Sequence, residues 1–282
     1  MKKITRRSFM AAAGLTVAAL ALTACGGSSS TASSAAASSV ASSAAASSEA
    51  ASAAATELTT VEAGKLTMAT NAAFPPYEMT TDAGEFEGID IETAQAIADK
   101  LGLELQIDDM DFDAALLSVQ QGKADIVMAG VTVTDERKAV MDFSDSYATG
   151  IQSIIVPEGS DIASPDDLAG KKIGTQRGTT GYIYCSDDFG DESVVAYDDG
   201  LTAVQALNNG QVDAVVIDNA PAKEFVAANP GLVILDTSYA EEDYAIGVAK
   251  GSSLKDVVNA ALEELKADGT LQSIVDKYIT AE

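Results

Sequence analysis

A sixteen-residue pattern occurs twice in this chain and limits the folds open to it. The first copy, A-L-L-S-V-Q-Q-G-K-A-D-I-V-M-A-G, ends at Gly130, and the second, A-V-Q-A-L-N-N-G-Q-V-D-A-V-V-I-D, ends at Asp218. Each copy is an apolar helical stretch, a glycine that ends the helix, an aspartate and an apolar run typical of a buried strand. Helix–glycine–strand units are common in α/β proteins, but the matched endings favour two similar lobes that face each other.

Around both copies, strands and helices alternate at short spacing, which indicates an α/β fold with a largely parallel sheet. The sequence predicts strands at 65–70, 103–107, 125–129, 152–156, 172–175, 232–235 and 244–249. It predicts helices at 90–101, 112–121, 219–228, 253–267 and 270–278, and a short one opened by Ser164-Pro165. Asp90 is expected to cap the first of these helices, and Gly102 to end it. Two prolines make 71–78 a stiff loop without regular structure.

The first candidate site residues follow the strand of the first copy. Gly130 breaks the strand, and Thr132 with Asp135 fits a loose capping box for the next helix. The N-terminus of that helix would point its free N–H groups at the end of the strand, where they attract anions.

Arg137 adds a cation whose planar fork of donors suits a carboxylate. Together, Gly130, Thr132 and Arg137 indicate a site for one small carboxylate. The alternative is a weak surface ion pair between Arg137 and Asp142 or Asp145.

Further candidates lie in the second half of the chain. The loop 176–181 contains Gly178, Thr179 and Thr180 beside an expected helix start, and it suits an anion or a ligand backbone. Turns use the same residue types, so this signal is weak. Asp218 follows its strand at the place that Gly130 holds in the first copy, just past the carboxyl end, where open α/β sheets bind ligands.

Charge and composition exclude several functions. The chain has 17 basic and 43 acidic residues, a net charge of −26, so it would be repelled by nucleic acid. It has no histidine, which excludes Ser-His-Asp and Cys-His catalysis and removes the commonest transition-metal ligand. We expect no cofactor and no metal. The two cysteines, Cys25 and Cys185, form no disulfide framework, and a buried structural Cys185 is favoured over a reactive one.

The first 25 residues are a targeting segment, with a basic region followed by an apolar one too short for a typical membrane span. L-T-A-C, ending at Cys25, resembles the bacterial lipobox, which predicts lipidation of Cys25. T-R-R-S-F-M also resembles a twin-arginine export motif, and the export route stays open. Residues 26–63, rich in Ser and Ala, are expected to be a flexible tether.

The folded body, from about Gly64 to Glu282, resembles the extracellular solute-binding proteins of polar amino-acid ABC importers, and is most similar to glutamine, arginine and lysine receptors. The motifs that carry the resemblance are N-A-A-F-P-P-Y-E at 71–78, G-I-D-I-E at 88–92, M-D-F-D at 110–113, A-G-V-T-V-T-D-E-R at 129–137, D-F-S-D at 142–145 and V-I-D-N-A at 216–220. They occur in one order across the body.

The resemblance implies a two-lobed periplasmic-binding-protein-like fold of type II, with two α/β lobes joined by a two-strand hinge. Lobe 1 would comprise 64–148 plus 244–282, and lobe 2 would comprise 149–243. The protein would be a monomer that binds a free L-amino acid and delivers it to a membrane permease. A lipid anchor would hold it on the extracellular face of a bacterial cell membrane.

The same resemblance implies the role of each site residue. Arg137 would bind the ligand carboxylate with Thr132 and the loop Gly178, Thr179 and Thr180. Asp218 would bind the ammonium with the Gly130 carbonyl. The ligand-binding set is then Asn71, Phe74, Phe112, Gly130, Thr132, Arg137, Gly178, Thr179, Thr180 and Asp218, with Phe74 and Phe112 around the ligand side chain and Asn71 near its tip.

The ligand side chain and the type of function each have alternatives. Receptors for cationic or amide side chains often have an acid where Asn71 stands, so the resemblance does not imply selection of arginine or lysine, and polar neutral, amide and basic side chains are alternatives. The alternative function is an enzyme on the same scaffold, dehydratase-like or glycan-cleaving, with Glu78 or Asp218 as its base. No pair of acids in the Phe74 or Thr132 loops is placed for acid–base work, so we predict a binding protein and not an enzyme.

Overall fold

The computed structural model describes residues 58–279. The targeting segment, Cys25 and most of the expected tether lie outside the described residues. The packed structure begins slightly before Gly64. Leu58 packs against the core, and the backbone N–H of Val61 donates to Asp125 Oδ1 at 2.8 Å.

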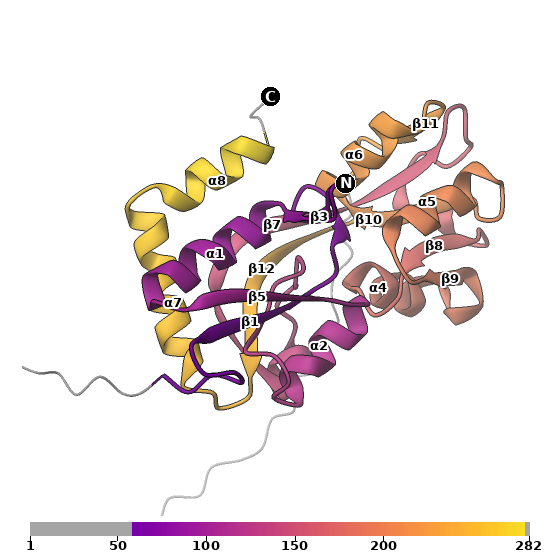
Figure 1. Ribbon diagram of the computed structural model, residues 1–282. Coiled ribbons are helices and arrows are strands. Elements are labelled where there is room, and N and C mark those ends of the chain that lie inside the picture. The colour runs from indigo at the N-terminus through magenta and orange to yellow at the C-terminus, as the bar shows by residue number, and fades with distance from the viewer. Residues whose placement is uncertain (1–57, 280–282) are drawn as a thin grey trace, which may run out of the picture. The chain divides into compact units, whose positions relative to one another are not determined.

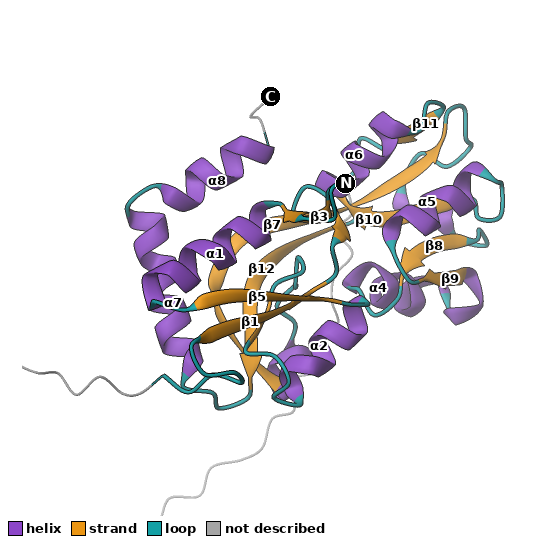
Figure 2. Cartoon of the chain, in the orientation of Figure 1, coloured by secondary structure: helices purple, strands orange, loops and turns teal. Residues whose placement is uncertain are grey.

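The described residues build one large mixed sheet (Figures 1 and 2). Its strand order is β5-β1-β6-β12-β7-β10-β8-β9, and β11 pairs with β7. The bounds are β1 Lys65–Thr70, β5 Glu104–Asp109, β6 Ile126–Val127, β7 Met141–Pro157, β8 Ile173–Gln176, β9 Val194–Tyr197, β10 Ala214–Asp218, β11 Leu232–Ile234 and β12 Ala240–Ala249. A small sheet contains β2 Ala73–Phe74, β3 Glu78–Thr80 and β4 Phe86–Glu87.

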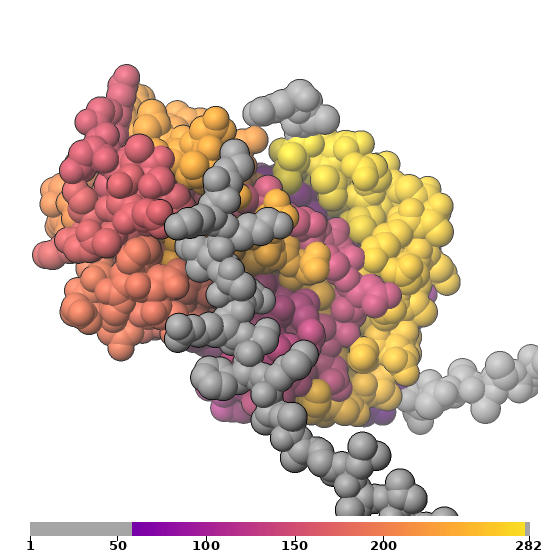
Figure 3. Space-filling view, turned by 180° about the vertical axis from the view of Figure 1, so that it is seen from behind, coloured from indigo at the N-terminus to yellow at the C-terminus, as the bar shows by residue number. Residues whose placement is uncertain are grey.

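Helices pack around both ends of the sheet, as Figure 1 shows. The α1 half consists of β5, β1 and β6 with α1 Ile89–Leu101, α2 Phe112–Gln120, α3 Asp135–Val140, α7 Leu254–Ala267 and α8 Thr270–Tyr278. The α4 half consists of β10, β8, β9 and β11 with α4 Thr180–Phe189, α5 Gly200–Asn208 and α6 Asn219–Ala228, and the 3-10 turns η1 Pro165–Leu168 and η2 Asp191–Ser193. In Figure 3 the C-terminal helices, yellow, and the pink and orange middle of the chain gather on opposite sides of the face shown.

Two long antiparallel strands, β7 and β12, connect the halves, with Gln152 opposite Ala240 and Met141 opposite Ala249. The pairs β1–β5, β1–β6, β8–β10 and β8–β9 are parallel, whereas every pair that involves β7 or β12 is antiparallel. The expectation of a largely parallel sheet is therefore wrong at its centre. β7 is also longer than the strand predicted at 152–156, because half-buried and exposed polar residues alternate with buried Met141, Phe143 and Tyr147 in its first part.

Each half has its own apolar core. Leu66, Ile97 and Leu262 are fully buried in the α1 half, and Val204 and Val215 are fully buried in the α4 half. Separate cores are the packing that two lobes require.

The repeated sequence pattern corresponds to a repeated contact. Asp125 Oδ2 accepts from the backbone N–H of Thr67 at 2.8 Å, and Asp213 Oδ2 accepts from that of Lys172 at 2.7 Å. The N–H groups of the same two aspartates donate to the carbonyls of Thr67 and Lys172. Each copy of the pattern thus aligns its strand with the neighbouring parallel strand in the same way.

Three local predictions are wrong. Thr134, not Thr132, caps α3, because its hydroxyl accepts from the backbone N–H of Arg137 at 3.1 Å. Asp90 lies inside the first turn of α1 and is fully buried, with Gly88 at the cap position. The segment 71–78 is partly regular, since Phe74 of β2 pairs with Glu78 of β3 around the two prolines. Gly102 ends α1 in the left-handed conformation, as predicted.

Candidate functional site

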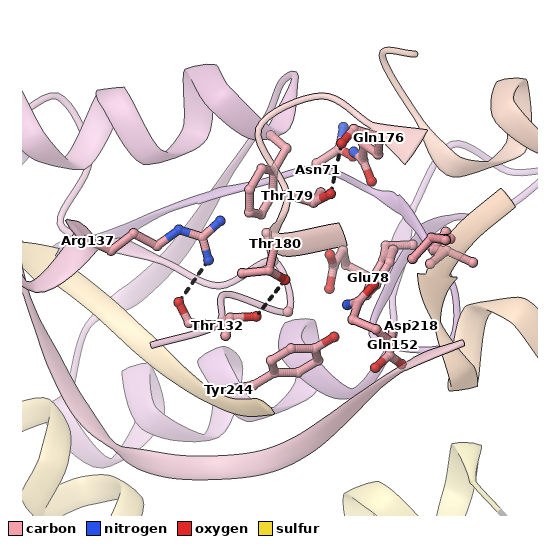
Figure 4. A pocket seen from close by; sticks show the side chains of 16 residues that line it. Asn71, Glu78, Thr132, Arg137, Gln152, Gln176, Thr179, Thr180, Asp218 and Tyr244 are labelled. Carbon is pink, nitrogen blue, oxygen red and sulfur yellow. Dashed lines mark hydrogen bonds between the residues drawn. The ribbon is translucent and has the colours of Figure 1, made fainter. Parts of the chain in front are cut away.

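One pocket lies between the two halves, beside the connecting strands β7 and β12 (Figure 4). Nine of the ten residues predicted from the sequence line it: Asn71, Phe74, Phe112, Gly130, Thr132, Arg137, Thr179, Thr180 and Asp218. The tenth, Gly178, does not line the pocket, but its carbonyl accepts a hydrogen bond from Arg137. Gln152 and Tyr244 also line the pocket and were not predicted to do so. Gln176, from the loop 176–181 expected to contact the ligand, and Glu78, named only as the base of the alternative enzyme, line it as well.

Arg137 is buried, with 9% of its surface exposed. Its Nη1 donates to the carbonyl of Thr132 at 2.8 Å, and its Nη2 donates to the carbonyl of Gly178 at 3.1 Å. The guanidinium lies 5.3 Å from the centre of the Phe112 ring. Burial lowers the pKa of Arg137, but a guanidinium still keeps its charge in a protein. A guanidinium has five N–H donors, so donors remain for a carboxylate.

The surface ion pair considered for Arg137 is not formed. Asp142 pairs with Lys250 at 2.8 Å, and Asp145 accepts from Asn259. Arg137 is therefore held inward, where its charge faces the pocket.

A buried carboxylate lies on the opposite side of the pocket in Figure 4. Asp218 ends β10 and is 2% exposed. Its Oδ2 accepts from the N–H of Ile151 at 2.6 Å, and its Oδ1 accepts from the N–H of Ala220 at 3.0 Å. Burial raises the pKa of Asp218 to about 6, although the two N–H groups stabilise the ionised form and so lower the pKa. The carboxylate is thus fixed in direction and poorly solvated, which suits it to a cationic group of a ligand.

The third part of the pocket is neutral. Gln176 Nε2 donates to Asn71 Oδ1 at 2.8 Å and to the carbonyl of Asp198 at 3.3 Å. Asn71 Nδ2 donates to the carbonyl of Met110 at 2.9 Å. Two amides from the two halves therefore meet across the pocket without a formal charge. Arg177, next to Gln176, points outward and is more than half exposed.

Aromatic rings form the apolar walls. Phe112 is 5% exposed at the start of α2, and Phe74 is half-buried in β2. Phe74 stacks on Tyr77 with ring centres 5.8 Å apart, and Tyr77 is buried in the core behind it. Gly130, at φ +54°, leaves no room for a side chain, because a Cβ there would lie 2.9 Å from the Phe74 ring.

Two buried acids, Asp90 and Glu78, lie side by side near Gly130, and the sequence did not predict that they form a pair. Asp90 Oδ2 accepts from the N–H of Gly130 at 3.1 Å and from the hydroxyl of Tyr147 at 2.7 Å. Glu78 is fully buried beside it, and burial followed by the Asp90 charge raises the pKa of Glu78 well above its usual value. Burial also raises the pKa of Asp90, to about 6. Both pKa shifts favour a protonated carboxyl group in this buried pair, and Asp90 holds Gly130 in place through its backbone N–H.

Glu242 was also missed. It lies in β12 with 7% of its surface exposed, and its Oε2 accepts from Thr132, Thr180 and Gln152. The sequence E-E-D at 241–243 looks like a solvated surface run, and only the alternation of a strand distinguishes the middle acid. No sequence signal indicated its partners, because they come from three distant segments.

The described region offers no evidence for a reactive thiol, a metal site or a membrane-spanning helix. Cys185 is fully buried, and burial raises the pKa of its thiol to about 12, which supports the structural role over the reactive one. Within residues 58–279, no cluster of three or more Cys, Asp or Glu side chains is arranged to hold a metal ion. None of the described helices combines the length and apolar character needed to cross a membrane.

Comparison with known proteins decides the family. The family model of bacterial extracellular solute-binding proteins, family 3, matches residues 66–281. The chain belongs to this family. Its two-lobed α/β fold and its character as a binding protein rather than an enzyme, both predicted from the sequence, agree with that membership.

Individual members of the solute-binding family are similar over most of their length. The chain is 33% identical to the L-cystine-binding protein TcyJ of Escherichia coli, over 78% of this chain and 85% of the relative. It is 33% identical to the arginine-binding extracellular protein ArtP of Bacillus subtilis, over 77% of this chain and 87% of the relative. The solved structure of an ancestral arginine-binding protein bound to glutamine is 42% identical, with a TM-score of 0.74, over 77% of this chain and 99% of that one.

Proposed function

We propose that this protein binds one free L-amino acid between its two lobes and delivers it to the permease of an ABC importer. The observation that carries the proposal is the pair of opposite charges at one pocket, a buried guanidinium and a buried carboxylate. A zwitterion needs one fixed cation and one fixed anion, and each charge-assisted hydrogen bond contributes about 1.5–3 kcal/mol. The names of the relatives, which cover cystine, arginine and glutamine, support an amino acid as the ligand class.

In this proposal Arg137 binds the α-carboxylate, and Asp218 binds the α-ammonium together with the carbonyl of Gly130. Phe74 and Phe112 enclose the ligand side chain. Asn71, with Gln176, faces its tip. The neutral amide pair supports a polar uncharged side chain over a cationic one, because no carboxylate of the pair compensates a buried charge.

The lobes in this proposal are 64–148 plus 244–282 and 149–243, and β7 and β12 act as the hinge strands between them. Three contacts already cross from one lobe to the other at the pocket: Arg137 to Gly178, Gln176 to Asn71, and Thr132 to Glu242. These contacts support a cleft that closes when its two walls share one ligand.

The location follows from the same family. Its members are extracellular, and we propose that a lipid on Cys25 anchors the protein to the membrane, with residues 26–57 as the tether and the protein a monomer. Metabolic labelling with a palmitate analogue tests the anchor, since Cys25→Ala is expected to abolish the label and release the protein from the membrane.

A thermal-shift screen against the twenty L-amino acids tests the binding function. Residues 26–282 are first unfolded and refolded to remove carried ligand. A ligand that binds only the folded state raises the melting temperature, by an amount that grows with its concentration. A rise with one or a few amino acids supports the proposal and names the ligand, whereas a flat result from folded protein contradicts it.

A further inference from the structure

Glu242 collects hydrogen bonds from three separate parts of the chain. Its Oε2 accepts from the hydroxyl of Thr180 at 2.8 Å, from the hydroxyl of Thr132 at 3.0 Å and from Gln152 Nε2 at 3.1 Å. Thr132 follows β6 in the α1 half, Thr180 begins α4 in the α4 half, and Gln152 lies in β7. The other oxygen, Oε1, is buried and has no hydrogen-bond partner among the described residues. One carboxylate thus joins both walls of the pocket to a connecting strand.

The chemistry of these contacts fixes the direction of two hydroxyl groups. A threonine hydroxyl has one proton to donate, and a carboxylate can only accept. The contacts to Glu242, at 2.8 and 3.0 Å, are shorter than the 3.4 Å between the two hydroxyls, so both protons are directed at the carboxylate. With their protons directed at Glu242, Thr132 and Thr180 keep only oxygen lone pairs for the pocket that they line. Neither hydroxyl can then donate to a ligand carboxylate, which was one role open to Thr132. Both are acceptors, suited to a ligand N–H.

The burial of Glu242 makes this arrangement persistent. Breaking a hydrogen bond to a buried charge leaves that charge uncompensated, which costs more than a bond in water. Arg137 lies close enough for its charge to be stabilised by Glu242, so the two buried charges also balance each other. The three donors therefore stay bound to Glu242 when a ligand arrives.

We propose that Glu242 is a positioning residue for ligand recognition, which makes Thr132 and Thr180 hydrogen-bond acceptors and so selects an α-ammonium over an α-hydroxyl group. The proposal rests on the proposed amino-acid function. It assigns Glu242 no contact with the ligand, because its side chain lies behind the threonines and not in the pocket lining. The same three hydrogen bonds link the two lobes through β12.

The test compares each amino acid that binds the wild-type protein with its α-hydroxy-acid analogue, by calorimetric titration. Glu242→Gln keeps the shape and one acceptor oxygen, but it removes the charge and replaces the other oxygen with an NH2 donor, so the threonine protons no longer face a group that can only accept. We expect affinity for the amino acid to fall at least tenfold, and the preference over the hydroxy acid to shrink at least fivefold. Glu241→Gln, an exposed neighbour on the same strand, is the control and is expected to change neither value.

A purely structural role for Glu242 gives a different result. The melting temperature without ligand would fall, while the preference for the amino acid would stay at its wild-type value, and that outcome overturns the proposal. If Glu242→Gln does not fold, Thr132→Val is expected to shrink the preference and Thr132→Ser to retain it, and an unchanged preference in Thr132→Val overturns the proposal. Absence of amino-acid binding by the wild-type protein would instead reject the proposed function, so the two failures are distinct.

Discussion

Arg137 Nη2 lies 3.1 Å from the carbonyl oxygen of Gly178, so the guanidinium that ends one wall of the pocket is hydrogen-bonded to the loop of the other. The same side chain donates to the carbonyl of Thr132 in its own half. These two contacts orient a buried cation toward the pocket. The position of Arg137 is therefore set by both halves of the sheet together.

Replacing Arg137 with alanine is expected to weaken amino-acid binding at least a hundredfold. Two charge-assisted bonds to a ligand carboxylate are together worth about 3–6 kcal/mol, and 1.4 kcal/mol corresponds to a factor of ten. Calorimetric titration measures the loss. Arg177→Ala removes an exposed arginine from the adjacent loop and is expected to bind normally. Normal affinity in Arg137→Ala would refute the assignment of this residue.

Gly178→Ala tests the loop on the α4 side. Gly178 has φ +73°, and a Cβ there would lie 1.6 Å from Asp113 Oδ1 in the other half. We expect affinity to fall several-fold because Asp113 must move and the loop is strained by about 1 kcal/mol. Gly170→Ala is the matched control, since Gly170 has φ +78° with nothing near its Cβ position. It should lower the melting temperature without changing affinity. Equal affinity in the two variants would count against closure at Gly178.

Asn71→Asp tests the neutral end of the pocket. The new carboxylate can still accept from Gln176 and would supply the charge that a cationic side chain requires. We expect the affinity for arginine and lysine, relative to glutamine, to rise about tenfold, the effect of about 1.4 kcal/mol. Asn208→Asp adds the same charge at an exposed position and should leave the ratio unchanged. A ratio that does not move in Asn71→Asp would remove this residue from the specificity site.

Binding is expected to weaken as the pH falls. The pKa of Asp218 is raised to about 6 by burial, and only the ionised form attracts an ammonium group. Between pH 7 and pH 5 the dissociation constant should therefore rise about tenfold. Titrations at several pH values check this. Asp90→Asn should be measured alongside, because the pKa of Asp90 is also about 6. Constant affinity over this range would contradict an ionised Asp218 in the complex.

Asp218 should affect the stability of the ligand-free protein in the opposite direction to ligand affinity. Its contribution to stability should fall as the pH rises, whereas affinity should rise. Its folded-state pKa of about 6 lies above the usual value of 3.8, so the folded protein holds this proton more tightly than the unfolded chain. The contribution of Asp218 to the free energy of unfolding is full below about pH 4 and is lost as the pH rises through 6. Asp218→Asn is expected to remove that contribution, as thermal unfolding at pH 4 and pH 7 would show.

Local sequence patterns were sufficient for much of the fold. The bounds of β1 and α6 agree with those predicted, because glycine, proline and aspartate at the ends of these elements determine them locally. The repeat also led to Gly130 and Asp218, which line one pocket. Strand ends are recognisable in a single sequence, and their place at one edge of a sheet follows from the α/β rules.

The missed residues have partners far away in sequence. Glu242 is bound by Thr132 and Thr180, which are 110 and 62 residues away, and Glu78 faces Asp90 from another element. An acid in a charged run is usually solvated, so burial of this kind is fixed only by tertiary packing. The cap of α3 was misplaced for a different reason. Thr132 and Thr134 both carry hydroxyls that could cap the helix. Thr134 is the cap, and the hydroxyl of Thr132 donates to Glu242 instead.

The proposed function requires that one free amino acid binds in the pocket that contains Arg137 and Asp218. The most direct measurement is a calorimetric titration of the unfolded and refolded protein with the amino acid that most raises its melting temperature. We expect one saturable site per chain with a dissociation constant of about 1 μM or lower, that is, about −8 kcal/mol or stronger. We also expect the site to be lost in Arg137→Ala and Asp218→Ala. Absence of a saturable site for all twenty amino acids, or unchanged binding in both variants, would contradict the proposed function.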